Sequence, residues 1–201
     1  ACNIAIPRTA LAPVCEPEAA GVVKDKVVRD AYVVVRGKKI AAVGDRSVVP
    51  GGASLVELGD STIVPGLIDC HTHLADMPNV ADPTDTLRYS PAEIAYSAIP
   101  NARATLLAGF TTVRDVGTYR AFNDVALRDA IAKGLVDGPR MYVAGAYLTI
   151  TGGAGAMTGL AQDIPLPPTL HYGEANGPWE VRARIRDLAH RGVRHDAAGA
   201  G

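Results

Sequence analysis

The segment Val64-Pro-Gly-Leu-Ile-Asp-Cys-His-Thr-His73 decides the fold. Residues 63–68 are apolar on both faces, as in a strand buried within a parallel sheet. Because side chains alternate along a strand, His71 and His73 are expected to point the same way, with Asp69 deeper on the same face. Two neutral imidazoles placed in this way can share one divalent metal ion. The segment therefore predicts a metal-binding strand end, the position where α/β barrels hold their active sites.

Beyond this segment, apolar strands alternate with helices, which is typical of consecutive β/α units. Ser90 is a good helix N-cap, whereas Pro100 should kink or split the helix that Ser90 begins. A glycine follows each expected helix, as in a C-terminal cap. We expect strands at 110–115 and 140–148, and helices at 91–108, 122–133 and 179–191.

The first sixty residues follow a different pattern, with short β-branched runs separated by turns. Strands are expected at 26–36, 39–43 and 53–58. The sequence therefore predicts two domains, residues 1–60 and residues 61–201.

Several segments together resemble one enzyme family. The segment quoted above closely resembles the first barrel strand of the metal-dependent amidohydrolase superfamily. The segment Val33-Val-Val-Arg-Gly-Lys-Lys-Ile-Ala-Ala-Val-Gly44 is similar to the small β-domain before that barrel, and residues 108–117 and 138–145 are similar to its second and third strands. The resemblance covers roughly residues 20–193 and is strongest to the branch of imidazolonepropionase-like and Xaa-Pro dipeptidase-like enzymes.

The resemblance implies an α/β fold that is incomplete in this chain. Residues 1–60 would form the N-terminal part of a small β-sandwich, and residues 61–201 the first three β/α units of a TIM-like (β/α)8 barrel. A whole barrel needs about 250 residues, and this chain has room for little more than half of one.

The family's later ligands have no match here. In the family, a lysine on strand four, two further histidines and a catalytic aspartate complete the site, so the catalytic residue of this chain is unknown. Residues 194–201 carry no strand pattern, which favours a frameshift, a truncated gene model or a deliberate fragment over a member that has lost its site. The other histidines are not expected to act as substitutes: His171, His190 and His195.

The resemblance also implies a reaction. One or two divalent metal ions, expected to be zinc, would activate a water molecule. This water would hydrolyse a carbon–nitrogen bond in a small amide, cyclic amide or dipeptide. His71 and His73 would be metal ligands. The isolated chain is expected to be inactive. The alternatives are a non-catalytic amidohydrolase-like module for binding or assembly, and an open half barrel that does not fold stably.

Weaker predictions concern residues near the strand ends. Tyr147, Gly152 and Gly153 are expected to contact substrate, because a long glycine-rich loop follows the third strand. Asp115 ends the second strand and is a further candidate for the site. Cys70 should point away from the histidines and pack in the core.

Composition excludes some functions. Hydrophobic residues make up 48% and charged residues 20%, and the formal net charge of −1 offers no basic field for nucleic acid or anionic lipid. No apolar run reaches the ~18 residues of a membrane helix. Three cysteines do not suggest a disulfide framework. We expect a soluble protein. The sequence leaves its compartment, cytoplasm or periplasm, open, and also whether the complete protein is a homo-oligomer.

Overall fold

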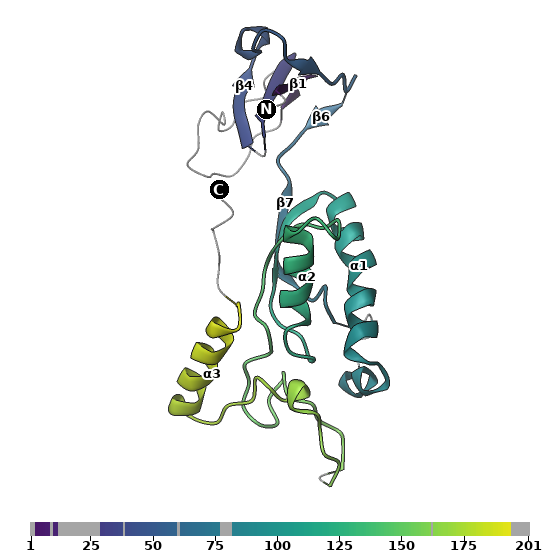
Figure 1. The fold of residues 1–201 in the computed structure, drawn as a ribbon, viewed down its shortest axis with the longest axis vertical. Coiled ribbons are helices and arrows are strands. Elements are labelled where there is room, and N and C mark those ends of the chain that lie inside the picture. The colour runs from purple at the N-terminus through teal and green to yellow at the C-terminus, as the bar shows by residue number, and fades with distance from the viewer. Residues whose placement is uncertain are drawn as a thin grey trace. The chain divides into compact units, whose positions relative to one another are not determined.

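The computed structural model contains two compact units, residues 1–65 and residues 66–201 (Figure 1). It describes residues 3–8, 10–11, 29–37, 39–59, 61–76, 82–161 and 163–193. The prediction for the tail 194–201 lies outside these residues. Within them, no helix is long and apolar enough to cross a membrane.

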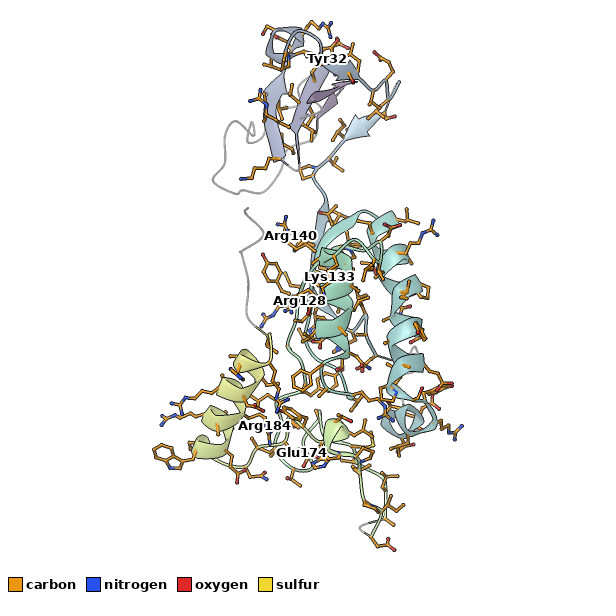
Figure 2. All side chains as sticks on the ribbon, viewed as in Figure 1. Tyr32, Arg128, Lys133, Arg140, Glu174 and Arg184 are labelled. Carbon is orange, nitrogen blue, oxygen red and sulfur yellow. The ribbon has the colours of Figure 1, made fainter. Side chains whose placement is uncertain are left out.

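The first unit contains a four-stranded sheet in the order β4-β3-β1-β5. Strand β3 pairs antiparallel with both β1 and β4, whereas β5 pairs parallel with β1. Ala31, Val33 and Val34 of β3 are buried. The ring centroid of Tyr32, labelled in Figure 2, lies 5.4 Å from the guanidinium carbon of Arg46. The elements of this unit are β1 (Asn3–Arg8), β2 (Ala10–Leu11), β3 (Ala31–Arg36), β4 (Lys39–Gly44), η1 (Arg46–Val48), β5 (Ser54–Leu55) and β6 (Thr62–Ile63), with β2 and β6 forming a parallel pair.

The second unit contains a parallel sheet in the order β7-β8-β9. Helices α1 and α2 lie side by side and pack against this sheet, α1 on β8 and α2 on β9 (Figure 1). This arrangement confirms the predicted alternation of strands and helices. The elements are β7 (Leu67–Thr72), η2 (Pro83–Arg88), α1 (Pro91–Leu107), β8 (Phe110–Asp115), α2 (Asn123–Ala132), β9 (Arg140–Tyr142), η3 (Pro168–Leu170) and α3 (Pro178–His190).

The start of α1 follows the predicted chemistry. The Ser90 hydroxyl accepts from the Glu93 backbone N–H at 3.2 Å, and the Glu93 carboxylate accepts from the Ser90 N–H at 2.7 Å, which makes a capping box. The prediction that Pro100 could split the helix is wrong, since α1 continues through it. Pro100 and Tyr96 are both exposed, so water can satisfy the Tyr96 carbonyl that loses its partner.

Strand β9 is shorter than the predicted strand 140–148. From two residues beyond the end of β9, backbone N–H groups donate to a carboxylate where a longer strand would donate to a neighbouring strand. Asp124 Oδ2 accepts from the backbone N–H groups of Ala144, at 3.1 Å, and Gly145, at 2.7 Å. Gly145 also has φ +78°, which ends the extended backbone.

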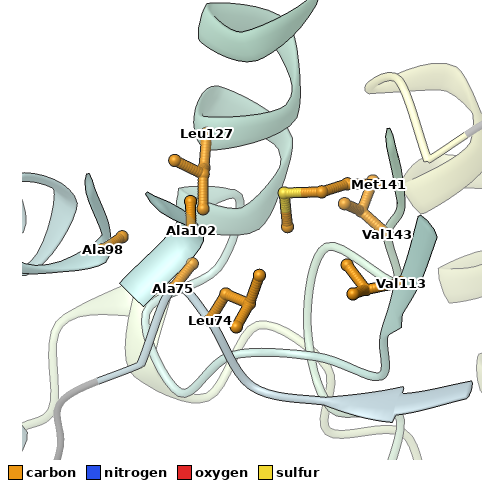
Figure 3. Close-up of a cluster of buried hydrophobic side chains, with 8 residues drawn as sticks. All are labelled: Leu74, Ala75, Ala98, Ala102, Val113, Leu127, Met141 and Val143. Carbon is orange, nitrogen blue, oxygen red and sulfur yellow. The ribbon is translucent and has the colours of Figure 1, made fainter. Parts of the chain in front are cut away.

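The main core of the second unit lies between the sheet and the two helices α1 and α2 (Figure 3). Its small alanines allow α1 to approach the sheet closely, and Leu127 and Met141 fill the space beside α2. Arg128 of α2, labelled in Figure 2, donates to the carbonyl of Gly192 just beyond α3. The core residues are Leu74, Ala75, Ala98, Ala102, Val113, Leu127, Met141 and Val143.

The predicted burial of the first barrel strand is wrong for this chain. Leu67 is 50% exposed and Ile68 66% exposed, because β7 is at the edge of the three-stranded sheet and, among the residues that the structure describes, pairs with β8 alone. Cys70, expected in the core, is exposed for the same reason.

Candidate metal site at the strand ends

The histidine pair lies at the carboxyl end of β7. His71 belongs to the strand and His73 directly follows it. The two ring centroids are 5.3 Å apart with the planes at 76°, so the structure brings both imidazoles together. Asp69 Oδ1 accepts from the backbone N–H of His71 at 3.0 Å. Asp69 therefore fixes the backbone before the pair.

One nitrogen of His73 is already occupied. Nδ1 lies 3.1 Å from the carbonyl oxygen of Gly117 and 2.8 Å from the hydroxyl oxygen of Tyr147. A carbonyl oxygen can only accept a hydrogen bond, so this network assigns the proton to Nδ1. The lone pair is then on Nε2, the form in which an imidazole binds a metal.

Asp76 is a site residue that the sequence did not reveal. Its Oδ2 accepts from the Tyr147 hydroxyl at 2.8 Å, and its Oδ1 accepts from the Tyr119 backbone N–H at 3.0 Å. Burial raises the pKa of Asp76, and these two hydrogen bonds oppose the rise. Burial, together with the charge of Asp76, raises the pKa of Tyr147. The available signal was a carboxylate three residues after His73, in a stretch that resembled an ordinary polar loop.

Two more buried carboxylates fix the loops around the pair. Asp115 Oδ2 accepts from the Leu74 N–H at 2.7 Å, and Oδ1 accepts from the Gly117 N–H at 3.2 Å. Burial, with the nearby charge of Asp124 as a smaller cause, raises the pKa of Asp115 to about 7. Burial also raises the pKa of Asp124, against its hydrogen bonds from the backbone. Asp115 thus holds Leu74, which follows His73 in the chain, and Gly117, whose carbonyl lies 3.1 Å from Nδ1 of His73.

The three residues predicted to contact substrate lie in different surroundings. Tyr147 packs against His73, with ring centroids 5.5 Å apart. Gly152 and Gly153 form a turn that closes on its own loop, where the Gly153 N–H donates to the Ile150 carbonyl at 2.9 Å. Thr151 ties this turn to a later loop through the Asn176 side chain at 3.1 Å.

The other histidines lie elsewhere. His171 is exposed and lines a small pocket that also includes Tyr147 and Gly155. His190 is exposed in the last turn of α3, and His195 lies outside the described residues. A second hollow beside α3 is lined by Glu174, Arg184 and neighbouring charged residues (Figure 2).

The donor chemistry of the pair fits part of a metal site. Two imidazoles, one with its Nε2 free by the assignment above, are ligands that zinc prefers. Among the residues that the structure describes, no group of three or more His, Cys, Asp or Glu side chains is placed to hold a metal. The nearby carboxylates of Asp69, Asp76 and Asp115 are engaged with the backbone and with Tyr147.

Several solved structures similar to this chain are named as hydrolases. A Xaa-Pro dipeptidase with bound methionine in its active site is 29% identical, with a TM-score of 0.76 over 94% of this chain and 45% of that chain. A prolidase complexed with N-methylphosphonate-L-proline is 27% identical, with a TM-score of 0.74 over 94% and 44%. The ochratoxinase of A. niger is also 27% identical, with a TM-score of 0.72 over 95% and 44%. This chain therefore spans less than half the length of each.

The sheets of this chain fit part of the amidohydrolase fold to which these structures belong. A comparison with curated proteins found no match. The sequence model of the amidohydrolase family matches residues 62–199, which is more than half of the chain. The chain belongs to the amidohydrolase family.

Proposed function

We propose that this chain is part of a metal-dependent hydrolase that cleaves carbon–nitrogen bonds in small amides, cyclic amides or dipeptides. The observation that carries the proposal is the paired imidazoles of His71 and His73 at a strand end, with Nδ1 of His73 held by the Gly117 carbonyl. Membership of the amidohydrolase family supports the reaction class. The similar Xaa-Pro dipeptidase and prolidase support a dipeptide as substrate.

The proposed architecture is the beginning of a larger fold. Residues 61–201 supply the first three β/α units of a TIM-like (β/α)8 barrel, and residues 1–60 supply part of a small β-sandwich. The order β7-β8-β9 and the division after Pro65 support this reading. The outer edge of β7, on the side away from β8, is where a further barrel strand would pair.

In the proposed mechanism, His71 and His73 would hold a divalent ion, zinc by expectation, through neutral imidazoles. When bound, such an ion would supply Lewis-acid chemistry and lower the pKa of a water toward ~7. The His73 Nδ1–H donates to Gly117 and so keeps Nε2 directed at the site. Asp115 holds the backbone N–H groups of Leu74, next to His73, and of Gly117. Tyr147 and the turn at Gly152 and Gly153 remain candidates for substrate contact.

A general base must also take the proton of the attacking water. Among the described residues, the carboxylates near the pair are engaged with the backbone and Tyr147, so none of them is assigned this role. We therefore expect little or no turnover from the isolated chain. Chelator-sensitive hydrolysis of dipeptides or N-acyl amino acids by the isolated chain would contradict this expectation.

The test is metal binding by the purified protein. Wild type, His71→Ala and His73→Ala are titrated with zinc, and the absorption spectrum of bound Co²⁺ reports the ligands. Each substitution should weaken binding by at least tenfold, because it removes a ligand. His190→Ala is the matched control, since His190 is exposed in α3. Unchanged metal binding in both site variants would contradict the enzyme proposal and favour a non-catalytic binding or assembly module.

A further inference from the structure

Tyr147 makes two hydrogen bonds through one hydroxyl group. Its oxygen lies 2.8 Å from Nδ1 of His73 and 2.8 Å from Oδ2 of Asp76. A phenol has one hydrogen, and the Asp76 oxygen accepts it. The hydroxyl oxygen is then free to accept from the His73 Nδ1–H, which it shares with the Gly117 carbonyl. The three side chains therefore form one chain of hydrogen bonds, Asp76 to Tyr147 to His73.

Both ends of this chain are attached to the loop that follows β8. The Tyr119 backbone N–H donates to Asp76, and the Gly117 carbonyl accepts from His73. Because residues 117 and 119 belong to the same short loop, the position of the His73 ring and that of its support are fixed together. Asp76 is only 4% exposed, so water does not replace these bonds easily.

The Tyr147 ring is held in a close-fitting slot. Gly117 has φ +130°, and a Cβ there would lie 2.9 Å from Cδ1 of Tyr147. A Cβ at Gly155 would lie 2.5 Å from Cβ of Tyr147, and one at Gly173 would collide with its carbonyl oxygen. The ring of Tyr119 packs edge-on with its centroid 5.0 Å away. These close contacts from three loops hold Tyr147 in one place. A fixed position suits a residue that supports a metal-ligating side chain better than one that contacts varied substrates.

We propose that Tyr147 and Asp76 are positioning residues that hold His73 in its Nδ1-protonated tautomer, with Nε2 facing the metal. The inference rests on the proposed function for the presence of a metal, and on geometry alone for the tautomer. Groups that orient a ligating histidine typically change metal affinity by about 10- to 100-fold when they are removed. Tyr147 then acts on the metal through His73.

The test uses Tyr147→Phe, which removes the hydroxyl and keeps the ring, and Asp76→Asn. The control is Tyr96→Phe, which removes a phenol hydroxyl from an exposed position on α1. The first readout is ¹⁵N NMR of the imidazoles in the metal-free protein at mildly alkaline pH. Wild-type His73 should be in the Nδ1–H form, and both site variants should lose part of that population. The second readout is affinity for zinc, which should fall by about tenfold or more in both site variants and stay unchanged in the control.

Three results would overturn the inference. The first is an Nε2–H tautomer of His73 in the wild-type protein. The second is unchanged zinc affinity and an unchanged His73 spectrum in a folded Tyr147→Phe variant. The third is a Tyr147→Phe variant that binds zinc normally but binds a dipeptide more weakly than wild type, since that result assigns Tyr147 to the substrate. If His71→Ala also leaves zinc binding intact, the proposed function fails, while the tautomer of His73 still tests this inference separately.

Discussion

Replacement of Asp115 by asparagine should change how the stability of this protein depends on pH. The side chain of Asp115 is 1% exposed, and burial raises its pKa from 3.8 to about 7. Between about pH 4 and about pH 7, Asp115 therefore keeps a proton in the folded state that it has released in the unfolded state. It follows that the free energy of unfolding falls as pH rises from about 4 to about 7. An amide side chain does not titrate, so Asp115→Asn removes the part of this fall that Asp115 causes.

The magnitude follows from the same shift. A shift of ~3 pKa units corresponds to about 4 kcal/mol. Against this, an amide has one acceptor oxygen, whereas Asp115 accepts from both Leu74 and Gly117, and one buried N–H left unpaired costs about 1–3 kcal/mol. The variant should therefore be less stable than wild type by about 1–3 kcal/mol near pH 4 and more stable by a similar amount near pH 8.

The assay is urea unfolding of both proteins at several values between about pH 4 and about pH 8, compared as a difference. Asp82→Asn is the control, because Asp82 is exposed and its hydrogen bonds from Thr84 lower its pKa. For Asp82 the stabilising contribution is lost as pH falls, so its difference curve should bend in the opposite sense and only in acid. A difference for Asp115→Asn that stays constant within about 1 kcal/mol across the range would refute the reasoning.

Two further predictions concern local structure. Ser90→Ala removes the hydroxyl that accepts from the Glu93 N–H at the start of α1, while the backbone N–H of residue 90 can still donate to Glu93. The change should lower the free energy of unfolding by about 1 kcal/mol, measured by urea unfolding; no change would mean that the Ser90 hydroxyl contributes nothing. Gly117→Ala places a Cβ against Tyr147 at φ +130° and should cost more than about 1 kcal/mol and weaken zinc binding. Gly134→Ala, also at positive φ but facing open space, should cost stability without changing zinc binding, and equal zinc affinities in the two variants would contradict the clash.

The elements of the second unit were predictable because their signals are local. Strand β8 has the predicted bounds 110–115, and α1 begins at the predicted cap, Ser90. The histidine pair was also readable, because alternation along a strand depends only on neighbouring residues. Glycines at the ends of the helices carry their own conformational signal, as at Gly134 with φ +71°.

The features that the sequence did not reveal depend on contacts between distant segments. Asp76 has its role only because the loops after β8 and β9 bring Tyr119 and Tyr147 to it, 43 and 71 residues away. The early end of β9 likewise depends on Asp124, about 20 residues before it in the chain. The exposure of β7 reflects which strands are present, and the apolar pattern of Leu67 and Ile68 cannot show that.

The three buried carboxylates have an evolutionary consequence. Asp76, Asp115 and Asp124 each hold a backbone N–H that belongs to a different element from their own. A substitution or insertion in one of these strand-end loops therefore disturbs its neighbours, and selection should keep their lengths fixed. The turn at Gly152–Gly153 closes largely on its own loop, so it can change in length and sequence at little cost to the histidine pair. This turn can therefore vary while the strand end that carries the histidine pair stays the same.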